Sequence, residues 1–138
     1  MKKRTLYLAL SIIMLLFSMA PAMAASTRAS DYISRYSSDV KVLSDSEIAI
    51  WFSIYGTDEM DCLGAEKISI YENLGNRWRM VELFERGDTG MSETDTYHFQ
   101  NVKYFSGEPG TEYKISIVLF AESGSGYDSR TRTHYITA

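Results

Sequence analysis

The 138-residue chain has one cysteine, Cys62, and two histidines, His98 and His134. A single cysteine forms no disulfide within its own chain, so Cys62 is either buried and inert or exposed and open to pairing between chains. Catalytic triads and metal sites need several such side chains close together, and no recognisable pattern of this kind is present. A glycine-rich loop opening a helix, the usual nucleotide-binding motif, is also missing. We therefore expect no enzyme activity, no cofactor and no metal site.

Basic residues are scarce as well. The chain carries 14 Lys and Arg against 18 Asp and Glu, and three of the basic side chains fall at positions 2–4. Because phosphate backbones are bound by clustered Lys and Arg, we expect no nucleic-acid partner. A small basic stripe, Arg130, Arg132 and His134, lies on one face of the last predicted strand. These side chains either form a contact surface for a partner protein, or they prevent an edge strand from pairing with other chains.

Long apolar runs are absent beyond residues 6–19. That run follows the basic positions 2–4 and precedes Ala22-Met23-Ala24, the small-residue pattern of a signal-peptidase site. It is shorter than the roughly 20 residues that span a bilayer. We expect residues 1–24 to be a signal peptide and residues 25–138 to be a single secreted domain. After cleavage it should be free of the membrane and monomeric.

Helical periodicity is missing after residue 25, where apolar and polar residues alternate. In residues 112–121, for example, Tyr113, Ile115 and Ile117 share one face. Clusters of Gly, Asn, Asp and Pro separate the alternating segments. The predicted strands are residues 31–43, 46–55, 65–72, 77–85, 94–105, 112–121 and 130–136. Seven short strands with turns between them predict an all-β, seven-stranded antiparallel β-sandwich.

Residues 109–117, Pro-Gly-Thr-Glu-Tyr-Lys-Ile-Ser-Ile, resemble the start of strand F in a fibronectin type III domain, an immunoglobulin-like sandwich. Residues 48–52 resemble strand B of that family, with Phe52 where tryptophan is common. The resemblance implies a tyrosine corner. In such a corner Tyr113 is buried after the Pro109–Gly110 turn, and its hydroxyl bonds to backbone near residues 107–110.

The sequence departs from the family six residues before that tyrosine, where a leucine is usual and Gly107 stands here. Val102, Tyr104 or Phe105 are the candidates to fill the gap. The mature pattern is also similar to small secreted proteins of gut-type Gram-positive bacteria with uncharacterised function. That resemblance implies bacterial export and no particular activity. The predicted function is therefore a non-catalytic binding or interaction module with a protein or glycan partner.

Two loops are candidates for the binding site, because the B–C and F–G loops of a fibronectin-like sandwich emerge at one end. The first, residues 56–64, carries Asp58, Glu59 and Asp61. The second, residues 122–129, carries Tyr127, a large amphipathic side chain of the kind common in binding loops. Three acidic side chains suit a cation or a basic partner, although the glycine and distal glutamate of a calcium loop are missing. The alternative is an ordinary solvated loop.

An aromatic face is the other candidate. Trp51 and Tyr55 lie opposite the isoleucine face of the strand over residues 46–55. An exposed platform of this kind would make the protein a carbohydrate-binding module, which is the alternative function. The face is otherwise covered by the N-terminal segment or by long side chains, because large aromatic residues usually bury most of their area.

Overall fold

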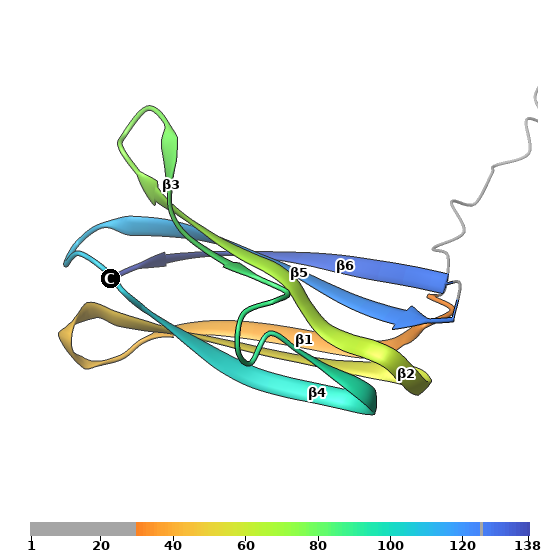
Figure 1. The fold of residues 1–138 in the computed structure, drawn as a ribbon. Helices are drawn as coiled ribbons and strands as arrows, with labels where there is room; N and C mark the ends of the chain where they lie inside the picture. The colour runs from red at the N-terminus through yellow and green to blue at the C-terminus, as the bar shows by residue number, and fades with distance from the viewer. Residues whose placement is uncertain (1–29, 125) are drawn as a thin grey trace, which may run out of the picture.

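The computed structural model describes residues 30–124 and 126–138, and the predicted signal peptide lies outside them (Figure 1). Antiparallel strands make one sheet that curls into a half-barrel, so the fold is all-β as predicted. Within the described residues no helix is long and apolar enough to cross a membrane. The elements are β1 (Ile33–Val42), the short 3-10 turn η1 (Ser44–Ser46), β2 (Glu47–Asn73), β3 (Trp78–Glu85), β4 (Ser92–Ser106), β5 (Glu112–Ser123) and β6 (Gly126–Thr137).

Strand β2 is 27 residues long and takes the place of two predicted strands and the loop between them. Its first part pairs with β1 and β4, and its second part pairs with β3 and β5. The pairing shifts register between Tyr55 and Met60, where the strand bends. The predicted loop over residues 56–64 is wrong, because the start of β4 pairs with residues 60–64 and satisfies their backbone groups there.

The second predicted loop, over residues 122–129, is a tight hairpin. Ser123 pairs with Gly126 and Phe120 pairs with Ser129, so β6 begins four residues before the predicted start at residue 130. Gly124 takes a φ of +55°, a conformation that suits glycine in a short hairpin connection. Only residue 125 separates Gly124 from the next strand, which leaves no long loop at this position.

The core lies inside the curl, between the β1–β2–β4 half and the β3–β2–β5–β6 half of the sheet. The predicted inward faces of β2 and β5 are confirmed, since alternate residues there are buried. The buried residues of β2 and β5 include Ile48, Ile50, Phe52, Ile54, Ile68, Ile70, Ile115, Ile117 and Leu119. Cys62 is buried too, which decides between its two alternatives.

Tyr113 has the predicted tyrosine-corner geometry. Its side chain is 1% exposed, and its hydroxyl accepts a hydrogen bond from the Glu108 amide at 2.8 Å. Pro109 and Gly110 occupy the centre of a turn closed by the Thr111 amide on the Glu108 carbonyl, with Gly110 at a φ of +78°. That is the pattern of a type II turn. The ring of Phe105 packs edge-on against Tyr113, 5.2 Å between centroids, whereas the atoms nearest to a Cβ at Gly107 would belong to Ala138, Ser46 and Tyr113.

The basic stripe of β6 lies on the inward side of its strand, where the half-barrel is open between β6 and β1. The Arg132 guanidinium lies over the ring of Tyr36, 5.4 Å from its centroid. The His134 ring nitrogen Nε2 is 2.7 Å from the Ser38 hydroxyl. These contacts join β6 to β1 across the open seam, a role that neither interpretation of the stripe included.

Acidification from about pH 7.5 to about pH 5.5 is expected to lower the melting temperature through His134. Burial lowers the pKa of His134, Arg132 lowers it further, and Asp39 opposes the change. The unfolded chain therefore binds the proton first, so stability is full above about pH 6.5 and falls as the pH drops toward the folded-state pKa. His134→Gln, which keeps a polar partner for Ser38, should show a smaller loss over the same range. An equal loss in both proteins would contradict this.

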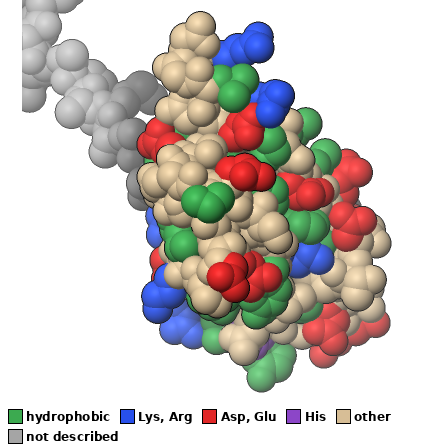
Figure 2. All heavy atoms as spheres, turned by 90° about the vertical axis from the view of Figure 1, so that its left-hand side faces the viewer, with side chains coloured by type: hydrophobic (Ala, Val, Ile, Leu, Met, Phe, Trp, Pro, Cys, Tyr) green, Lys and Arg blue, Asp and Glu red, His purple; other side chains and the backbone are tan. Residues whose placement is uncertain are grey.

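The end of the molecule that carries the C-terminus and the β4–β5 turn shows acidic side chains over its centre and right-hand side, and basic side chains mainly at the top and lower left (Figure 2).

Candidate functional site

The acidic residues Asp58, Glu59 and Asp61 are exposed on the bend of β2. Asp58 accepts a hydrogen bond from the Glu59 amide at 2.8 Å, and Asp61 accepts one from the Gly124 amide. The second contact ties the bend to the β5–β6 hairpin, so the two predicted loop regions do meet at one end. Among residues 30–124 and 126–138, no group of three or more His, Cys, Asp or Glu side chains could hold a metal ion.

Tyr127 lies on the outer face of the sheet, near the start of β6. Its ring stacks on the buried ring of Phe120, 6.0 Å between centroids and 14° from parallel. The Arg86 guanidinium lies 4.1 Å from the centroid of the same Phe120 ring and pairs with Glu122. Partial burial, followed by the charge of Glu66, raises the pKa of Tyr127. Tyr127 is thus one wall of a small side-chain cluster rather than the tip of a loop.

The outer face of β1–β2–β4 carries the other candidate site. Because β2 is the middle strand, each outward residue of β2 has one neighbour from β1 and one from β4. Two aromatic rows flank a row of smaller polar side chains. The rows are Arg35–Tyr55–His98, Ser37–Ser53–Gln100 and Asp39–Trp51–Val102.

The ring of Tyr55 is not available for stacking with a ligand. The Arg35 guanidinium lies 4.3 Å from the centroid of its ring, and the His98 ring stacks on it at 4.0 Å and 17°. Arg35 comes from β1 and His98 from β4, so the Tyr55 ring is flanked from both sides. Long side chains cover this part of the predicted aromatic face, as one of the two alternatives expected.

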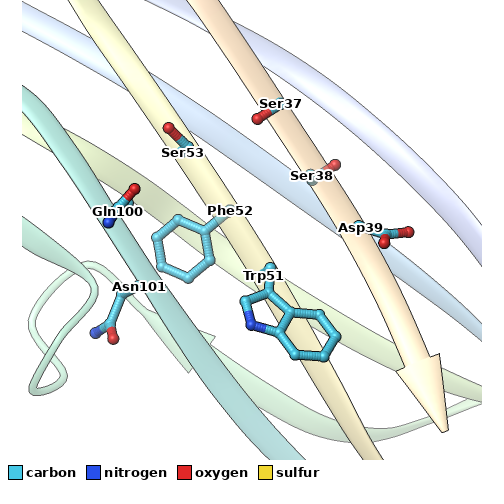
Figure 3. Close-up of a pocket in the computed structure, with 8 residues that line it drawn as sticks. All are labelled: Ser37, Ser38, Asp39, Trp51, Phe52, Ser53, Gln100 and Asn101. Atoms are coloured by element: carbon cyan, nitrogen blue, oxygen red, sulfur yellow. The ribbon is translucent and has the colours of Figure 1, made fainter.

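Trp51 differs from Tyr55, since its side chain is 37% exposed. Figure 3 shows the indole face-on, lying across the sheet toward Asp39 of β1. Beside it is a hollow with a volume of about 200 Å³. The hollow is lined by Ser37, Ser38, Asp39, Trp51, Phe52, Ser53, Gln100 and Asn101.

The polar members of this site were not found from the sequence. Ser37, Asp39 and Gln100 carry no local signal, because they meet Trp51 and Ser53 only through the register of three strands. The alternation of β1 and β4 could have shown which residues face outward. It could not have shown which of them stand side by side. The site combines one aromatic face with two hydroxyls, one amide and one carboxylate, which suits a small ligand rich in hydrogen-bonding groups.

The chain has no significant match among protein-family models, curated proteins or solved structures. The function proposed below is therefore inferred from the geometry of the site.

Proposed function

We propose that the protein is an exported, non-catalytic binding module with a fibronectin type III-like fold, and that it binds its ligand at the hollow beside Trp51. The observation that carries this proposal is the exposed indole of Trp51 next to a hollow whose lining includes Ser37, Ser53 and Gln100. Exposed tryptophans are costly to leave in water and are enriched where proteins bind partners.

Two features support the fibronectin-like fold. The first is the tyrosine corner at Tyr113. The second is strand order: if residues 47–56 and 62–73 of β2 are counted as two strands, β1, β2 and β4 make one layer and β3, β2, β5 and β6 make the other. In immunoglobulin-like sandwiches strands A, B and E share one sheet and strands C, F and G share the other. The structure departs from that pattern because β2 is one continuous strand.

The absence of catalysis is supported by the surroundings of two serine–histidine contacts. The Ser53 hydroxyl lies 3.5 Å from His98 Nε2, and the Ser38 hydroxyl lies 2.7 Å from His134 Nε2. Within the described residues, no carboxylate hydrogen-bonds to either imidazole to orient it as a base. The backbone of β2 around Ser53 pairs with β1 and β4, which leaves no amide pair beside that serine for an oxyanion.

Export rests on residues 1–24, whose charge, apolar run and small-residue site match a cleaved signal. We expect the exported protein to begin at Ala25. N-terminal sequencing of protein recovered from outside the cell checks this, and a sequence that begins at Met1 would contradict it.

Trp51→Ala is expected to weaken ligand binding at least about tenfold while leaving the melting temperature nearly unchanged, since the lost ring is a surface platform. Retention of the protein on a panel of immobilised polysaccharides and secreted proteins measures this. Tyr135→Ala is the matched control, because Tyr135 is 61% exposed on the outer face of the other half of the sheet. The proposal requires a ligand that retains the wild type and Tyr135→Ala but not Trp51→Ala. Retention independent of Trp51 would refute the site.

A further inference from the structure

We propose that the ligand of the hollow is a sugar ring, stacked on the free face of Trp51 with its hydroxyls on the polar row. This inference rests on the proposed function, because it names the ligand class for the same site. It assigns roles to Ser37, Asp39, Ser53 and Gln100.

The indole supplies the stacking surface. An aromatic face carries partial negative charge, and the C–H groups on one face of a pyranose carry partial positive charge, so the two surfaces attract when they lie parallel. The Trp51 indole lies across the sheet and is 37% exposed, which leaves ring surface for such a contact. Tyr55 adds no second platform, since Arg35 and His98 flank its ring. The site therefore takes one ring rather than a run of stacked rings.

The polar row supplies the hydrogen bonds. Ser37 and Ser53 each donate and accept, and the Gln100 amide does both through separate atoms. One Asp39 carboxylate oxygen accepts from the Val40 amide at 3.0 Å, which fixes that carboxylate on the β1 side of the site. Sugar hydroxyls also donate and accept, so a row of mixed donors and acceptors can satisfy several of them at once.

A peptide fits this place less well. Peptides that add a strand need a free sheet edge, and β2 is paired on both sides here. Peptide helices need a long apolar groove, whereas this hollow has about 200 Å³ and four polar side chains on its rim. Pockets for drug-sized ligands have about 300–1,000 Å³, so a single ring matches the smaller space better than a longer segment. With one ring and one platform, binding should be weak, in the millimolar range.

The two tryptophans of the chain allow a direct test by fluorescence. In Trp78→Phe, Trp51 is the single reporter, and in Trp51→Phe, Trp78 is the single reporter. The probes are the methyl β-glycosides of glucose, galactose and N-acetylglucosamine, titrated against the full protein. We expect at least one of them to give a saturable change in the emission of Trp78→Phe and no change in that of Trp51→Phe.

Calorimetry on the sugar that binds then tests the polar row. Ser53→Ala and Gln100→Ala should each weaken binding several-fold without lowering the melting temperature, and Trp51→Ala should weaken it at least tenfold. Sugar binding that survives Trp51→Ala would overturn the inference. So would a Trp51-dependent protein ligand in a protein that binds none of the sugars, although the proposed binding function would then stand. If no ligand of any kind depends on Trp51, the proposed function fails as well.

Discussion

Gly64→Ala is expected to destabilise the protein by about 3 kcal/mol, because β2 and β4 approach too closely there for a side chain. A Cβ at residue 64 would lie 2.3 Å from the Met91 carbonyl oxygen and 2.6 Å from the Ser92 Cα. Both are backbone atoms, so no rotamer change can relieve the contact. The strands would have to separate at a place where the Ala65 amide bonds to the Met91 carbonyl at 2.7 Å.

Gly87→Ala is the matched control for this prediction. Gly87 lies between β3 and β4, and an added Cβ there meets no atom within 4 Å. Its effect should stay within about 0.5 kcal/mol, as is usual for surface substitutions. Urea unfolding of both variants measures the difference in the free energy of unfolding. Equal stability of the two variants would mean that β2 and β4 are not packed as closely as the structure has them.

Gly64 also illustrates a feature that the sequence alone does not determine. Gly56 and Gly64 bracket a polar stretch, which by local rules indicates a loop. In the fold, Gly64 serves a close approach of two strands, and the polar stretch is the bend of one long strand. A glycine in a strand can mark such an approach as well as a turn. Only the position of the second strand decides between a close approach and a turn. That position depends on residues far away in the sequence.

Features set by local patterns were predictable. Period-two alternation located the inward residues of β5, because alternation follows from strand geometry alone. The tyrosine corner at Tyr113 was also predictable, since its turn and the Glu108 amide that donates to its hydroxyl lie within five residues. The binding site was only half predictable. Trp51 and Tyr55 have the same alternation, yet Tyr55 is flanked by Arg35 and His98 while Trp51 stays open. That difference comes from neighbours on other strands.

Tyr127 was a candidate binding residue from the sequence, and its surroundings predict that it also contributes to stability. Its ring covers Phe120, which is fully buried although it lies on the outer face of β5. On the remaining side the Arg86 guanidinium covers Phe120, held by Glu122 and by Glu66 at 3.7 Å. The cluster is a second small core outside the curl of the sheet, closed by side chains that have long aliphatic or aromatic parts.

Phe120→Ala is therefore expected to lower the free energy of unfolding by about 3 kcal/mol, the lower end of the range for a buried phenylalanine. Tyr127→Ala should lower it by about 1 kcal/mol, because it exposes one side of the Phe120 ring and removes a stacked pair. The two losses should not add. Once Phe120 is gone, Tyr127 has no ring to cover, so the double variant should be more stable than the sum predicts by about 0.5–1 kcal/mol.

Urea unfolding of the two single variants and the double variant measures this coupling. Tyr104→Ala provides the comparison, because Tyr104 is 52% exposed on β4 and should cost less than Tyr127→Ala. If the losses of Phe120→Ala and Tyr127→Ala are simply additive, the stacked pair contributes nothing and Tyr127 is an ordinary surface residue. A non-additive result would place Tyr127 in the architecture of the fold.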